Sequence, residues 1–114
     1  MKDPLIYIEH IFEAINRIEE YTKDLKLDGF LENSLIQDAV IRNFEIIGEA
    51  TKNIDDSFRN IYPTLEWKKM AGMRDKLIHD YIGVDLWAVW GVVEKILPNL
   101  RNQIEFILKD ERKC

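Results

Sequence analysis

Apolar residues recur at helical spacing in four long stretches of this chain. The stretches run from Pro4 to about Lys26, from about Phe30 to about Ile54, from Trp67 to Tyr81, and from about Val84 to about Lys109. In each one the apolar side chains fall on one face of a helix, which turns by about 100° per residue. Because the connections are short and no strand pattern is present, we predict an all-α, antiparallel, up-and-down four-helix bundle. A short extra helical turn is expected between residues 55 and 64, before the third helix.

Several residues mark where these helices begin and end. Asp3 followed by Pro4 is typical of an N-cap and the first helical position. The sequence Leu-Asp-Gly at 27–29 is expected to break the first helix. Thr64 is predicted to cap the third helix, and Gly83 to end it.

The last helix contains a proline and an unusually placed tryptophan. Pro98 lies inside the apolar pattern, so a kink is expected there rather than an end. Trp87 lies beside Gly91 outside the main stripe, where it is either an interface anchor or a cover for the core. The predicted buried side consists of Leu86, Val89, Trp90, Val93, Ile96, Leu97, Leu100, Ile104, Ile107 and Leu108.

A basic residue interrupts the apolar face of the third helix. Arg74 falls in the middle of this face, with Trp67 and Tyr81 seven positions away on either side and about 20° from it. An unpaired buried guanidinium would cost several kcal/mol, so Arg74 needs hydrogen-bond partners or an open cleft. His79, five residues on, is the side-chain type that titrates near neutral pH. The alternative is a purely structural role for both residues. Arg74 would then pair with a carboxylate, and the helix dipole would stabilise a positively charged His79 at the C-terminal end of the helix.

Asn43 is the second polar residue at a predicted core position. It lies in the centre of the apolar face of the second helix. One interpretation is a core amide that bonds a backbone carbonyl. The other is that Asn43 and Arg74 face each other across a helix–helix contact and help to satisfy one another.

The remaining charged residues of the first two helices are interpreted as solvent-facing. His10 lies on the polar face of the first helix, near Glu13 and Arg17, and nothing nearby resembles a set of metal ligands. A charged stripe on the second helix is expected to be a solvated face with pairs three or four residues apart. It consists of Asp38, Arg42, Glu45, Glu49 and Lys52.

The length and composition are those of one globular domain, residues 1–114. The chain has 46% hydrophobic residues, and its 16 basic and 21 acidic residues give a formal net charge of −5, which does not favour tight non-specific binding to nucleic acid. Residues 59–79 nevertheless carry five basic residues against two acidic ones. Cys114, the only cysteine, has no disulfide partner, no signal-peptide pattern is seen, and no apolar run reaches the ~18 residues of a membrane span. We therefore expect a cytoplasmic protein without membrane attachment, metal or cofactor.

Arg74 and His79 suit phosphodiester cleavage. Histidine can take or give a proton at neutral pH, and arginine can hold a phosphate with two hydrogen bonds. With no cluster of metal ligands, a metal-independent reaction is expected, in which the ribose 2′-hydroxyl of RNA is the nucleophile. Residues five apart on a straight helix point about 140° apart. The two side chains can therefore meet only if the helix distorts or if a two-fold dimer brings two such helices together.

The run Arg74-Asp75-Lys76-Leu77-Ile78-His79-Asp80-Tyr81 resembles the Arg-x4-His-x-Tyr motif of the HepT-like branch of the HEPN superfamily. The segment RNFEIIGEA at 42–50 is similar to the second helix of that family. The start of the last helix, GVDL at 83–86, followed by Trp90 and Pro98, is similar to the final helix of the same family. The polar Asp75 after the arginine also fits the superfamily. The resemblance covers nearly the whole chain.

This resemblance implies a four- or five-helix bundle and a homodimer whose motif lines a cleft between subunits. It further implies the toxin of a toxin–antitoxin module and a metal-independent endoribonuclease. In that scheme Arg74 binds phosphate and His79 acts as acid or base, with Asn43 and Asp75 in support. The implied partner is an MntA-like nucleotidyltransferase antitoxin that transfers AMP to Tyr81. The added phosphates would place negative charge beside Arg74 and His79.

Two other functions are open from the sequence. The first is a non-catalytic subunit that docks a nucleotidyltransferase and contributes a pocket, with Arg74 as a ligand clamp. The second is a purely structural module. RNA cleavage in EDTA that depends on His79 would separate the ribonuclease from both.

Overall fold

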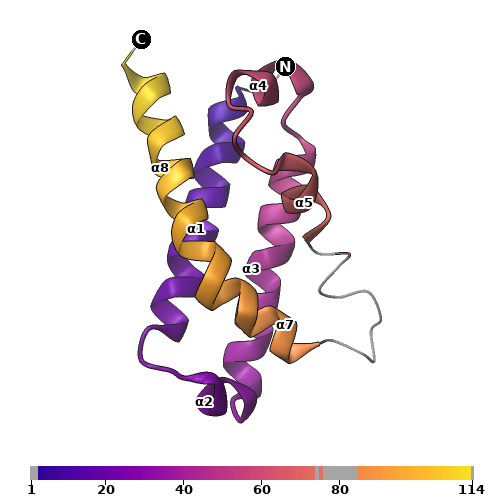
Figure 1. Ribbon diagram of the computed structural model, residues 1–114, viewed down its shortest axis with the longest axis vertical. Coiled ribbons are helices and arrows are strands. Elements are labelled where there is room, and N and C mark those ends of the chain that lie inside the picture. Colours follow the sequence, from indigo (N-terminus) through magenta and orange to yellow (C-terminus); the bar gives the residue numbers. More distant parts are fainter. Residues whose placement is uncertain (1–2, 74, 76–84, 114) are drawn as a thin grey trace.

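Two long antiparallel helices form one side of the fold. The computed structural model describes residues 3–73, 75 and 85–113. Helix α1 (Pro4–Thr22) packs along α3 (Ser34–Lys52) (Figure 1). The carboxylate of Asp3 accepts a hydrogen bond from the backbone N–H of Leu5 at 2.9 Å, which confirms the predicted start of the first helix. The predicted apolar face of this stretch was Ile8, Ile11, Phe12, Ile15, Ile18 and Thr22. All of these are buried except Phe12, which is partly buried, and Ala14 is buried as well.

The connection between these helices is itself helical, which corrects the predicted break. The first helix ends at Thr22, earlier than the predicted end near Lys26, and helix α2 (Leu27–Leu31) occupies the segment that was expected to interrupt it. The side chain of Phe30 is fully buried, and its ring lies 5.2 Å from that of Trp90. Burial of this ring and two hydrogen bonds from Gln37 to the last carbonyls of α2, at 2.9 and 3.1 Å, hold the short helix together. Tertiary packing therefore outweighs the low helix propensity of glycine here.

Helix α3 begins later than predicted, after α2 has ended. Its N-cap is Asn33, whose side chain accepts a hydrogen bond from the N–H of Ile36 at 3.0 Å. The predicted start near Phe30 was therefore wrong, because Phe30 belongs to α2. The buried face of α3 also includes Phe44 and Thr51. These two residues are not part of the apolar face that the sequence predicts for this stretch, which consists of Ile36, Ala39, Val40, Ile47, Ala50 and Ile54.

The segment after α3 forms two short helices that lie across the bundle. Helix α4 (Asp56–Ile61) is the predicted extra turn, and its N-cap Asp55 accepts a hydrogen bond from the N–H of Phe58 at 3.0 Å. Helix α5 (Trp67–Ala71) begins after Glu66, with no side-chain cap bond. Thr64 is therefore not its cap, because the chain still turns at Leu65, which bonds back to the carbonyl of Tyr62.

Helix α5 ends earlier than predicted. Gly72 has φ −88° and ψ 3°, outside the helical region, and its N–H bonds the carbonyl of Lys68 at 3.0 Å. One continuous helix over residues 67–81 was therefore wrong. Glycine is a weak helix former, and the structure breaks the helix at this residue. Met73 and Asp75 are helical again.

The last helix contains a π-helical turn just before its proline. Helix α7 (Leu86–Gly91) continues into the π-turn η1 (Val92–Ile96) and then into α8 (Leu97–Arg112). Asp85 caps it by accepting from the N–H of Ala88 at 3.1 Å, which confirms the predicted start. Pro98 has no N–H, and its ring would clash with the carbonyl four residues back, so the extra residue of a π-turn accommodates it. The turn also shifts the register, and Ile96, predicted to be buried, is 52% exposed.

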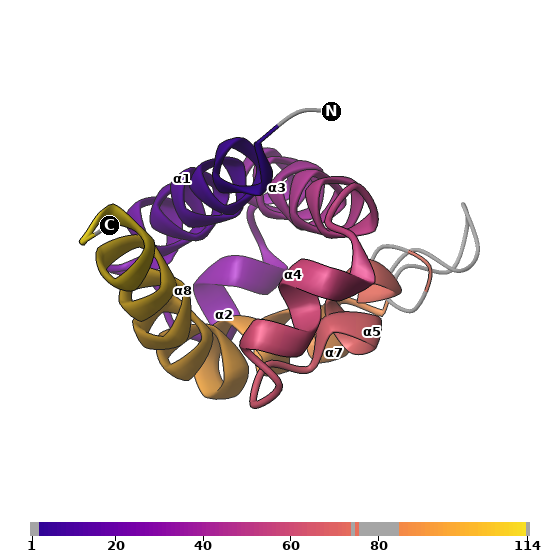
Figure 2. The same ribbon diagram turned by 90° about the horizontal axis from the view of Figure 1, so that it is seen from above.

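The buried apolar side chains of these helices form one cluster. Seen end-on, α1, α3 and α8 surround the core, and α4 and α5 close the remaining side (Figure 2). The described residues contain helices and no strand, so the all-α prediction is confirmed. The up-and-down order of four long helices stays a prediction, because Arg74 and residues 76–81 of the predicted third helix lie outside the described residues. None of the described helices has the length and apolar character to cross a bilayer.

A tyrosine ties the segment between α4 and α5 to the end of α8. The side chain of Tyr62 is only 7% exposed, and its hydroxyl bonds Asp110 at 2.6 Å and also contacts the carboxylate of Glu111. Its backbone carbonyl accepts a hydrogen bond from the indole of Trp67 at 3.0 Å. Burial, and then the bonds to the two carboxylates, raise the pKa of Tyr62 above its ordinary value of 10.0.

Replacing Tyr62 by phenylalanine should destabilise the fold. The change removes a charge-assisted hydrogen bond, so the free energy of unfolding should fall by about 1–2 kcal/mol. Tyr21→Phe, at a residue that is 40% exposed, is the matched control and should change the stability little. Urea unfolding of both variants measures this. Equal stabilities for the two variants would contradict the assigned role of the Tyr62 hydroxyl.

The same hydroxyl should make the protein sensitive to alkaline pH. The pKa of Tyr62 is higher in the folded state than in the unfolded one. The stability that the Tyr62 hydroxyl contributes is therefore fully present below about pH 10 and is lost as the pH rises above that value. Unfolding free energies measured on both sides of that pH should show a steeper decline for the wild type than for Tyr62→Phe. If the stabilities of the two proteins decline in parallel, the pKa of Tyr62 is not raised by folding.

Candidate functional site

The residues that the sequence singled out for chemistry lie between α5 and α7. Arg74, His79 and Tyr81 are outside the described residues, so their predicted roles stay predictions. The described chain reaches the motif from both sides, ending at Met73 and resuming at Asp85, with Asp75 described between them. Met73 is buried at 9% exposure and Asp75 is exposed. The arginine therefore follows directly on a core residue.

Helix α5 is held by burial of its apolar side against α3. Trp67 is 6% exposed and Met70 is 3% exposed, and the ring of Trp67 lies 6.4 Å from that of Phe58 on α4. These contacts and the indole hydrogen bond fix the orientation of α5. Packing against the core thus fixes α5, the helix that precedes the motif in the sequence.

Asn43 is buried on α3, as the sequence predicted. Its side chain is 5% exposed, and its Nδ2 donates to the carbonyl of Ala39 at 2.8 Å. This is the core amide of the first interpretation. Its Oδ1 has no hydrogen-bond partner among the described residues. The alternative contact with Arg74 involves a residue outside them and stays a prediction.

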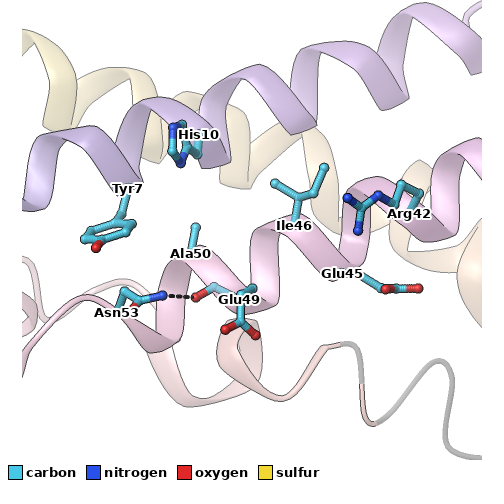
Figure 3. Close-up of a pocket in the computed structure, with 8 residues that line it drawn as sticks. All are labelled: Tyr7, His10, Arg42, Glu45, Ile46, Glu49, Ala50 and Asn53. Carbon is cyan, nitrogen blue, oxygen red and sulfur yellow. Dashed lines mark hydrogen bonds between the residues drawn. The ribbon is translucent and has the colours of Figure 1, made fainter.

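A hollow of about 360 Å³ lies between α1 and α3, at a place where the sequence analysis expected only solvated charge. In Figure 3, Tyr7 and His10 project from α1, while Arg42, Glu45 and Glu49 belong to α3. The rings of Tyr7 and His10 meet edge to face, 6.3 Å apart. His10 is exposed, as predicted. What the sequence missed is that α1 and α3 bring it to the same hollow as Arg42.

A larger groove of about 620 Å³ separates α5 from the last helix, and we call it the α5–η1 groove. One wall comes from the α5 side and the other from α7, η1 and α8. The wall on the α5 side includes Glu66, Lys69, Met70 and Met73. The opposite wall includes Gly91, Val92, Lys95, Ile96, Asn99 and Gln103. Met73, in the wall on the α5 side, is the residue before Arg74 in the sequence.

The sequence analysis did not find this groove, and the reason is the π-turn. On an uninterrupted α-helix Ile96 would point into the core, and no opening would be expected beside it. The one available signal was Pro98 inside the apolar run. Among the described residues no group of three or more His, Cys, Asp or Glu side chains is placed to hold a metal ion.

The sequence matches a known family over most of its length. The model of the family described as "Ribonuclease HepT-like" matches residues 11–107. The chain is 47% identical over 103 residues to a protein of Thermococcus cleftensis named "Probable ribonuclease HepT", covering 90% of this chain and 94% of that protein. The matched range includes the Arg-x4-His-x-Tyr run.

A second relative is longer than this chain. It is a protein of Methanocaldococcus jannaschii named "Gamma-glutamylcyclotransferase and putative RNase", 50% identical over 109 residues. The match covers 96% of this chain but only 49% of that protein. The chain therefore spans about half the length of this relative, while it spans nearly all of the protein from T. cleftensis.

The fold is shared with a solved structure. The HEPN toxin of Shewanella oneidensis, tri-AMPylated and in complex with its MNT antitoxin, superposes with a TM-score of 0.64 and 27% sequence identity. The superposition covers 96% of this chain and 99% of the toxin. The family match, the identity to these relatives and the shared fold agree: this chain belongs to the HepT-like ribonuclease family.

Proposed function

We propose that this protein is the toxin of a toxin–antitoxin pair and acts as a metal-independent endoribonuclease. The observation that carries the proposal is the family match over residues 11–107, a range that contains Arg74, His79 and Tyr81. The name of the relative from T. cleftensis and the toxin–antitoxin complex of the relative from S. oneidensis support it.

The proposed reaction needs no group outside the chain and the RNA. The 2′-hydroxyl of a ribose attacks the adjacent phosphorus, and the bond from phosphorus to the 5′-oxygen of the next nucleotide breaks. His79 serves as the acid or base that moves a proton in this step. Arg74 holds the phosphate through two hydrogen bonds and stabilises the charge that develops on it. The products are a 2′,3′-cyclic phosphate and a 5′-hydroxyl.

A homodimer is part of the proposal for a geometric reason. Arg74 and His79 are five residues apart, so on one straight helix they diverge by about 140°. A two-fold axis near the motif would place Arg74 of one subunit beside His79 of the other.

The proposed regulation acts on the same site. The relative from S. oneidensis is tri-AMPylated and bound to an MNT antitoxin. We propose that a nucleotidyltransferase of this type binds the present chain and transfers AMP to Tyr81. Each added nucleotide carries a phosphodiester charge, which would compete with RNA for Arg74 and occupy the space beside His79.

Replacing His79 by alanine should abolish RNA cleavage in EDTA. Loss of a general acid or base typically costs about 10²- to 10⁴-fold in rate. The matched control is His10→Ala, because His10 is the only other histidine and is exposed on α1. Cleavage rates of the three proteins on one labelled RNA, with their oligomeric states, measure this. Undiminished cleavage by the His79→Ala protein would remove the assignment, and absence of cleavage by the wild type would favour a non-catalytic docking subunit.

Replacing Tyr81 by phenylalanine should prevent modification by the nucleotidyltransferase. Phenylalanine keeps the ring but lacks the hydroxyl that accepts AMP. Intact-protein mass after incubation with ATP and the transferase should show added adenylyl groups on the wild type and on Tyr21→Phe, and none on Tyr81→Phe. Equal labelling of all three proteins would show that the acceptor is another residue.

A further inference from the structure

We propose that the α5–η1 groove binds a single-stranded segment of the substrate RNA next to the cleaved phosphate. This inference rests on the proposed function, because it names where the rest of the substrate lies. The groove is close to the motif along the chain, since Met73 in its wall immediately precedes Arg74. A strand held at the phosphate by Arg74 would therefore continue into this groove.

The charge of the groove suits a polyanion, although the chain as a whole is acidic. Lysines stand on both walls, Lys69 on α5 and Lys95 on η1. The carboxylate in the wall, Glu66, already bonds Lys69 at 2.7 Å. Both partners of that ion pair are well exposed, at 79% and 65%, so the pair is weak and a phosphate can compete for the lysine. No salt bridge between described residues involves Lys95.

The apolar and amide side chains that line the groove suit nucleobases. Met70, Met73 and Ile96 offer apolar surface against which the faces of bases can pack. Asn99 and Gln103 carry amides that both donate and accept hydrogen bonds, as the edges of bases require. The volume of about 620 Å³ lies within the range of small-molecule sites, so the groove can accommodate a nucleotide.

Gly91 leaves open space in the same wall. A Cβ added at this residue would meet no atom within 4 Å. A side chain at position 91 therefore has room at its Cβ, and leucine is a better helix former than glycine. Gly91→Leu is expected to fill part of the groove, and its urea unfolding curve beside that of the parent protein checks that the fold is kept.

The test measures RNA binding without cleavage. The probe is a short labelled oligoribonucleotide whose 2′-hydroxyls are methylated, so that the proposed nucleophile is absent. Fluorescence anisotropy gives its affinity for the His79→Ala protein in EDTA at several salt concentrations. Lys69→Gln, Lys95→Gln and Gly91→Leu are introduced into that protein. The matched control is Lys109→Gln on α8, which removes an exposed lysine that also pairs with a glutamate on its own helix, Glu105 at 3.6 Å.

Each groove lysine should contribute one contact to phosphate. Its replacement should weaken binding about threefold or more and reduce the slope of log affinity against log salt by about 0.7. Gly91→Leu should also weaken binding, and Lys109→Gln should leave both quantities unchanged. Affinities for Lys69→Gln and Lys95→Gln that equal the control's, or no binding of the probe at all, would overturn the proposal.

Two further results separate this inference from its alternatives. If Gly91→Leu changes the oligomeric state or the binding of the nucleotidyltransferase but not the RNA affinity, the groove is a protein interface and the proposal is wrong. If the wild type never cleaves RNA, the proposed function fails. The comparison of lysine variants then still decides whether the groove binds RNA.

Discussion

The point at which the described chain ends before the motif depends on the burial of one short helix, α5, against the core. Trp67 and Met70 place α5 on α3, and Met73, the residue before Arg74, is buried in the same core cluster. The indole of Trp67 bonds the carbonyl of Tyr62, and Tyr62 in turn bonds the end of α8. The start of the motif is thus tied through two aromatic residues to the C-terminal helix.

The same arrangement opens the α5–η1 groove. Helix α5 packs on α3, while the last helix changes register at the π-turn before Pro98. The two elements border the groove and do not close over it. Proline thus has two effects: it prevents a regular helix, and it turns Ile96 out of the core, to a position where its side chain lines the groove. The groove has a lysine on each wall, although the chain as a whole is acidic.

The sequence predicted most of the fold because apolar periodicity and capping residues are local signals. The first helix start at Asp3, the extra turn after Asp55 and the last helix start at Asp85 are all set by side chains that bond the next turn. The error at residues 27–31 arose where a distant contact outweighed the local preference, whereas the break of α5 at Gly72 follows from a local property of glycine. Phe30 becomes helical because its ring is buried beside Trp90, far along the chain, and no window of neighbouring residues contains that information.

The candidate site was predictable only in part. Asn43 could be recognised because a polar residue in the centre of an apolar face stands out, and it is buried. The groove could not, because it depends on a π-turn and on how far apart two elements lie. The roles of Arg74 and His79 rest on the motif and the family, and they stay proposals because these residues lie outside the described part of the chain.

The central claim is that a ribose hydroxyl, with no metal, performs the cleavage. The most direct measurement uses one labelled RNA and the same RNA with a single 2′-deoxynucleotide before the cleaved bond, both incubated with the wild type in EDTA. The account predicts that the all-ribose strand is cut, leaving a 2′,3′-cyclic phosphate, and that the deoxy-substituted bond stays intact. Cleavage of the deoxy-substituted bond, or a product ending in a 3′-hydroxyl, would contradict it.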